Sequence, residues 1–99
     1  MTNDEKRKLI IPWIDPAERI TVHFLDERDL VAEVTGTSDQ LVDLSIETKV
    51  PHMRQQVSVP LSHTEVSEDL GHYTRDPDRP LKHRRLMLVV NEKRPAVIY

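Results

Sequence analysis

The sequence predicts a mainly β protein: a single small barrel-like or strongly twisted antiparallel sheet of about five to six strands, with little helix. Apolar and polar residues alternate in several short runs, which is the period of half-buried strands. Polar turns with Gly, Asp, Asn or Pro separate these runs. At 99 residues the chain has the length of one domain, and it contains no cysteine for a disulfide or a thiolate site.

Residues 1–19 are predicted to form an N-terminal arm. The stretch from Leu9 to Ala17 contains Pro12 and Pro16. Each proline removes a backbone donor and biases the preceding residue away from helix, so the stretch is expected to be extended. Trp13, the sole tryptophan, is expected either to pack in the core or, within an arm, to anchor a partner.

Residues 20–99 are predicted to form one small β domain. The alternating runs 20–25 and 30–35 flank a polar turn that begins at Asp26, which is typical of a hairpin. The next segment, 38–48, is ambiguous. Its apolar residues alternate as in a strand, whereas Thr37 and Gln40 are spaced like a helix capping box; the β-branched content favours the strand.

The second half of the domain contains two clear strand patterns. Residues 56–61 alternate, with Pro60 requiring an edge or a strand end, and 86–90 is the most apolar run of the chain. Residues 62–69 are predicted to be a short turn or a continuation of the preceding strand. The last residues, Pro95 to Tyr99, are expected to form an edge strand that could pair with a second copy and give a homo-oligomer.

A long polar loop is predicted at 71–85, because Gly71, Pro77 and Pro80 interrupt regular structure. This loop concentrates positive charge. The candidate binding residues are Arg75, Arg79, Lys82, Arg84 and Arg85, together with Trp13. The cluster predicts an electrostatic docking element for an acidic protein surface or a nucleic-acid backbone, with a solubilising loop as the alternative.

The order of strands and turns resembles the SH3-like and Sm-like small β-barrels, and also small uncharacterised bacterial β domains. The residues that fall near the first Sm motif are Val22, Phe24, Asp26, Leu30, Val34, Gly36, Asp39, Leu44 and Ile46. The run from Leu88 to Ile98 resembles the second motif. This resemblance implies a barrel. It does not imply binding of uridine tracts, because Asp43 stands at the position of the base-contacting Asn.

A second similarity is to PilZ domains. Asp43, Leu44 and Ser45 follow a strand like the Asp-x-Ser-x-x-Gly motif of that family. Thr48 stands in place of the glycine, and no Arg-x-x-x-Arg pair precedes the motif to grip a guanine and a phosphate. Cyclic di-GMP binding is therefore not expected.

The sequence predicts neither a cofactor nor a metal site. Metal-ligating residue types gather at His63, Glu65, Glu68, Asp69 and His72. They lack His-Glu-x-x-His spacing, and a solvated polar turn explains them more simply. No Gly-x-Ser-x-Gly elbow is present, and two glycines cannot build a phosphate-binding loop, so an enzyme is not expected.

The function predicted from these patterns is a non-enzymatic, cytoplasmic protein-interaction module. The alternative is a nucleic-acid-binding small barrel that uses the basic residues of 75–85. The balance of 14 Lys and Arg against 17 Asp and Glu argues against a general nucleic-acid binder, whose affinity comes mainly from phosphate neutralisation. No membrane partner is expected, because the apolar runs are far shorter than the roughly 20 residues of a spanning helix.

Overall fold

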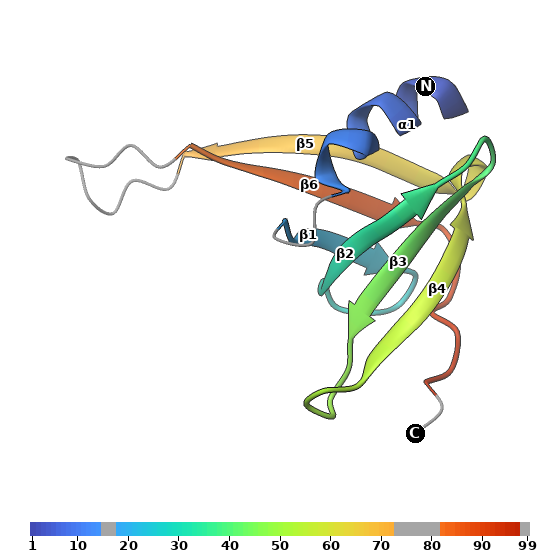
Figure 1. Ribbon diagram of the computed structural model, residues 1–99, viewed down its shortest axis with the longest axis vertical. Helices are drawn as coiled ribbons and strands as arrows, with labels where there is room; N and C mark the ends of the chain where they lie inside the picture. Colours follow the sequence, from blue (N-terminus) through green and yellow to red (C-terminus); the bar gives the residue numbers. More distant parts are fainter. Residues whose placement is uncertain (15–17, 73–81, 98–99) are drawn as a thin grey trace.

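The computed structural model describes residues 1–14, 18–72 and 82–97. Within them six strands form one mixed sheet with the order β4-β3-β2-β1-β6-β5 (Figure 1). The strands are β1 (Ile20–Phe24), β2 (Leu30–Thr37), β3 (Leu41–Glu47), β4 (Arg54–Pro60), β5 (Thr64–His72) and β6 (Lys82–Val90). The helical elements are α1 (Asn3–Ile10) and the 3-10 turns η1 (Ile11–Trp13) and η2 (Leu61–His63). The prediction of a mainly β fold with a strongly twisted sheet is confirmed, and the sheet is not closed into a barrel.

The ambiguous segment 38–48 contains a strand, β3. Its alternating residues Val42, Leu44 and Ile46 are all fully buried, while Leu41 and Glu47 are exposed. The pattern of period two therefore outweighs the capping-box spacing, because only an extended backbone directs these three side chains to one face. The same alternation explains β1, whose burial follows its sequence pattern residue by residue.

One strand pair departs from the expected antiparallel sheet. β1 runs parallel to β6, with Thr21 opposite Met87 and Phe24 opposite Val90. β6 therefore lies between β1 and β5 and has no free edge over this length. The prediction of a last strand is wrong for its described part, since residues 95–97 form no strand, and residues 98–99 lie outside the described chain.

The two edge strands of the sheet are joined by a single 3-10 turn. β4 and β5 lie at opposite ends of the strand order, yet only η2 separates them in the sequence. The sheet must therefore curl until its edges meet at this corner. Leu61 donates its N–H to the Gln40 carbonyl beside β3, and Asn91 donates its N–H to the His63 carbonyl after β6, both at 2.8 Å. These bonds fix the corner to strands from both halves of the sheet.

The N-terminal segment is helical and belongs to the core, so the extended conformation predicted from Leu9 onward is wrong for residues 9–13. Thr2 caps α1: its Oγ1 accepts from the Glu5 N–H, and its own N–H donates to the Glu5 carboxylate, each at 3.2 Å. That backbone hydrogen bond lowers the pKa of Glu5 below its usual value. Pro12 is tolerated because it lies in the first turn of η1, where no intrahelical N–H bond is needed.

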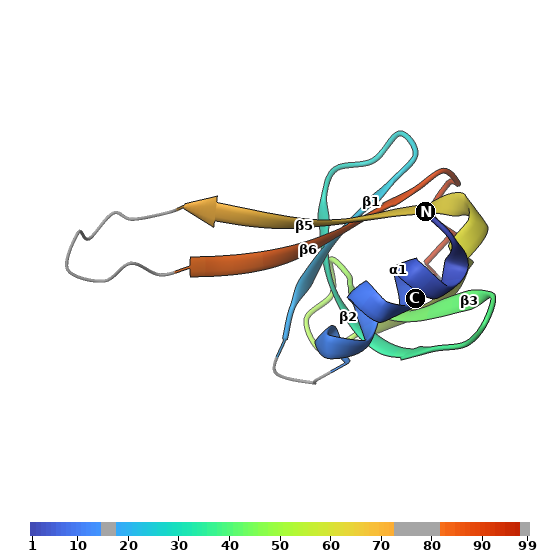
Figure 2. The same ribbon diagram turned by 90° about the horizontal axis from the view of Figure 1, so that it is seen from above.

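α1 packs between the two halves of the curled sheet, against β2, β5 and η2 (Figure 2). Ile10 is fully buried and Trp13 is 7% exposed. Lys6 lies on the same face and is only 9% exposed. Its Nζ donates a 2.6 Å hydrogen bond to the Leu61 carbonyl. The helix thus contacts both edges of the sheet through the turn that joins them.

The sequence predicts a short turn or a continuation of the preceding strand at 62–69. In the structure residues 62–63 belong to η2 and residues 64–69 to β5. After Val66 the strand continues through Ser67, Glu68 and Asp69 before Leu70, so no apolar alternation marks its full length. Residues 71–72 belong to β5 and residues 82–85 to β6. The predicted loop at 71–85 therefore extended too far at both ends, and its centre, 73–81, lies outside the described residues.

The helix makes a clear prediction for stability. Ile10→Ala should lower the free energy of unfolding by about 2–5 kcal/mol, because it opens a cavity in the core. The neighbouring Ile11, which is 50% exposed, provides a matched control that should change it by less than about 0.5 kcal/mol. Urea unfolding of both variants measures the difference. Equal, small effects would mean that residues 3–13 are a dispensable arm after all.

Candidate functional site

Three of the five basic residues predicted to bind a partner lie in β6. Lys82, Arg84 and Arg85 belong to the first half of this strand, whereas Arg75 and Arg79 lie outside the described residues. β6 pairs with β1 only from Met87 onward. Its earlier residues pair with β5 alone, from Leu86 opposite Glu68 to Lys82 opposite His72.

This part of the hairpin forms a two-stranded ribbon, residues 68–72 and 82–86. Figures 1 and 2 show β5 and β6 running together away from the other strands. A hairpin of two strands contributes little independent stability, since three or more strands or a covering helix are needed for that. Beyond the fully buried Leu86, the ribbon extends outward from the rest of the sheet.

Trp13 is not part of this ribbon. It lies in η1 and belongs to the hydrophobic core. Of its two expected roles, the structure shows core packing, and the side chain is not presented to a partner. A tryptophan buried beside Ile10 contributes a large apolar surface to the seam that the helix fills.

A second candidate site lies where the chain leaves β6. Arg94 is 12% exposed and donates from Nε to the Gln55 side-chain oxygen at 2.6 Å. Its Nη2 donates to the Glu47 carbonyl at 3.1 Å, and its Nη1 is 3.9 Å from a Glu27 carboxylate oxygen. Gln55 in turn donates to the Pro95 carbonyl at 2.8 Å. One guanidinium thereby holds the C-terminal segment against β3 and β4.

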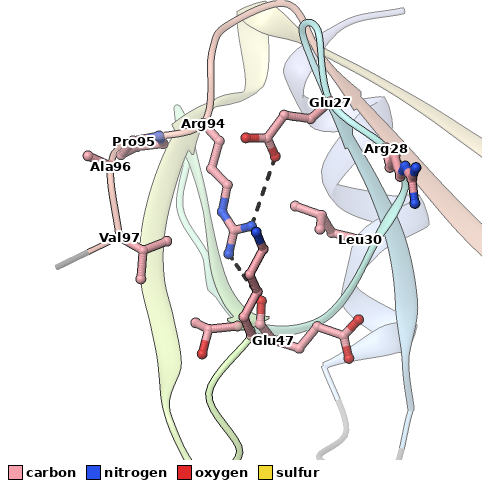
Figure 3. A pocket seen from close by; sticks show the side chains of 10 residues that line it. Glu27, Arg28, Leu30, Glu47, Arg94, Pro95, Ala96 and Val97 are labelled. Atoms are coloured by element: carbon pink, nitrogen blue, oxygen red, sulfur yellow. Dashed lines mark hydrogen bonds and ion pairs between the residues drawn. The ribbon is translucent and has the colours of Figure 1, made fainter. Parts of the chain in front are cut away.

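These contacts border a cavity of about 490 Å³. Figure 3 shows Leu30 and Val97 pointing into it from opposite sides, with the Arg94 guanidinium between them. Arg28 and Lys49 add two further cations to the lining. Sequence reasoning missed this site because Arg94 stands in an ordinary polar turn and its hydrogen-bond partners lie 39 and 47 residues away.

The PilZ-like residues are engaged within the sheet. Asp43 accepts a 2.5 Å hydrogen bond from the Ser58 hydroxyl across β3 and β4. Ser45 accepts from Arg54 Nε at 2.7 Å and from Gln56 Nε2 at 3.1 Å. Cross-strand bonds of this kind stabilise the β3–β4 pair, and they use the groups that a ligand would need.

Two histidines of the described chain, His23 and His63, each pair with a single carboxylate. The Nδ1 of His23 on β1 lies 2.9 Å from Asp29, and His63 Nδ1 bonds to Glu92. Among residues 1–14, 18–72 and 82–97, no three His, Asp or Glu side chains are grouped to hold a metal ion. Within the same ranges, neither α1 nor a 3-10 turn has the length and apolar character of a membrane-crossing helix.

Comparison of the chain with protein-family models, with curated proteins and with solved structures finds no match.

The Arg94 contacts predict a stabilising role for Gln55. Gln55→Ala should lower the free energy of unfolding by about 1–3 kcal/mol, because it leaves a largely buried guanidinium N–H without its acceptor. Gln40→Ala, at an exposed position, is the matched control and should cost less than about 0.5 kcal/mol. Chemical denaturation gives both values. If the two variants lose the same stability, the bonds of Gln55 do not hold the C-terminal segment.

Proposed function

We propose that the chain is a non-enzymatic, cytoplasmic protein-interaction module that docks through the β5–β6 ribbon. The observation that carries this proposal is the continuation of β5 and β6 beyond the reach of β1. A ribbon that adds little to the core is a costly feature for folding alone, whereas projecting strands are a common means of reaching a partner. The absence of cysteine and of a nucleophile elbow in the sequence supports a non-enzymatic role.

The charges of the whole hairpin favour a protein partner over nucleic acid. Residues 64–90 carry equal numbers of acidic and basic residues. The acidic ones are Glu65, Glu68, Asp69, Asp76 and Asp78, and the basic ones are Arg75, Arg79, Lys82, Arg84 and Arg85. In the described registers, Asp69 lies opposite Arg85. A phosphate backbone binds best to a surface with excess positive charge, while a protein surface can complement charges of both signs.

The test compares the parent protein with a triple variant, which carries Lys82→Ser, Arg84→Ser and Arg85→Ser together. The matched control replaces three exposed cations elsewhere, Lys8, Arg19 and Lys93, by serine. Each protein is immobilised and its bound proteins from a lysate of the native host are quantified by mass spectrometry. We expect a specific partner on the parent and the control and a loss of about tenfold or more on the ribbon variant. Melting temperatures should change little, because a two-stranded hairpin contributes little independent stability.

Two results would contradict the proposal. In the first, the ribbon variant retains the same partners as the parent. In the second, the parent binds duplex DNA or single-stranded RNA at physiological salt with an affinity that falls steeply as salt is added, which is the signature of counterion release. That second result would instead support the nucleic-acid-binding alternative.

A further inference from the structure

The cavity beside Arg94 has the features of a small-ligand site and takes no part in the proposed docking. Its volume, about 490 Å³, lies in the range of about 300–1,000 Å³ that is common for ligand pockets. Leu30 and the segment 95–97 supply apolar walls, and charged side chains supply the remainder. An apolar wall combined with a few polar groups suits a ligand with a charged end and an apolar end.

Arg94 has hydrogen-bonding capacity to spare. A guanidinium carries five N–H donors, and the described contacts use Nε and one N–H of Nη2. Its Nη1 faces the Glu27 carboxylate at 3.9 Å, which is an ion pair but too long for a hydrogen bond. Planar carboxylates are the groups that match a guanidinium best. The Arg94 guanidinium is thus held rigidly by two hydrogen bonds while its Nη1 can still bind a carboxylate.

The net charge of the residues that line the cavity predicts the charge of the ligand. The lining contains Arg28, Lys49 and Arg94 together with Glu27 and Glu47, which is an excess of one positive charge. A monoanion neutralises this excess, whereas a dianion such as phosphate overshoots it. We infer that the cavity binds a small monocarboxylate on a short apolar chain, with its carboxylate at Arg94 and its chain against Leu30 and Val97, two apolar side chains of the lining.

Glu27 has a specific role in this inference. Its carboxylate occupies the position beside Nη1 that the ligand would take, and its side chain is 40% exposed, so it can move into water. The ligand must displace Glu27 or tolerate a like charge nearby, and either costs affinity. Removing the charge of Glu27 should therefore strengthen binding, an effect opposite to that of most substitutions in a site.

Hexanoate is a suitable probe, followed by NMR of the Arg94 Nε–H and of the Leu30 and Val97 methyl groups. We expect these signals to shift together with a Kd of about 1–10 mM, the range open to a ligand of this size. Hexanamide, which has the same chain without the charge, should bind about fivefold more weakly or worse. Acetate tests the apolar chain and should also bind more weakly, as should inorganic phosphate.

Two variants test the inference while Arg94 itself stays unchanged. Glu27→Gln should tighten hexanoate binding by about three- to tenfold, and Lys49→Gln should weaken it by about threefold. Lys8→Gln, an exposed lysine of α1, is the control and should have no effect. The inference is overturned if hexanamide or phosphate binds as well as hexanoate, if Glu27→Gln leaves the affinity unchanged or weakens it, or if the shifted signals lie away from the cavity.

Discussion

The hydrogen bond from the buried Lys6 ammonium to the Leu61 carbonyl is the contact on which the rest of the structure depends. Leu61 begins the single turn that connects the two edges of the sheet, and Lys6 reaches it from the helix that fills the space between the sheet halves. A charged group taken out of water must be hydrogen bonded, so the ammonium fixes the helix at this corner. The sheet can then remain open along β4 and β5 and still enclose a core, because α1 covers the seam that a closed barrel would seal by strand pairing.

This arrangement separates the parts that fold the chain from the parts proposed to bind. The core is built from the helix and the inward residues of all six strands, while β5 and β6 continue past the reach of β1. The Arg94 cavity differs from the ribbon because its proposed binding group is also part of the fold. Its central guanidinium also holds the C-terminal segment to Gln55 and Glu47, so structure and proposed ligand binding share one side chain. In the two proposals, charge drives docking at the ribbon, whereas a pre-positioned donor drives binding in the cavity.

Much of the sheet could be predicted from the sequence, because strands with one buried face show it as alternation. Val42, Leu44 and Ile46 are the clearest case, and the hairpin at 20–35 is another. α1 has a sequence signal in the capping pair Thr2 and Glu5, which sequence reasoning missed, and the prolines that follow favour an extended segment. The second half of β5 has none, since its sequence does not alternate between apolar and polar residues. The Arg94 site depends on contacts between segments far apart in sequence, and no local pattern could reveal it.

Substitution of Lys6 by methionine tests the central contact most directly. Methionine keeps the unbranched apolar stem but cannot donate a hydrogen bond, so the Leu61 carbonyl loses its partner in the buried corner. We expect Lys6→Met to lower the free energy of unfolding by about 1–3 kcal/mol. Lys8→Met, on the exposed side of the same helix, should change it by less than about 0.5 kcal/mol. Equal stability of the two variants in urea, or a more stable Lys6→Met protein, would show that the corner holds without the ammonium and would contradict its central role.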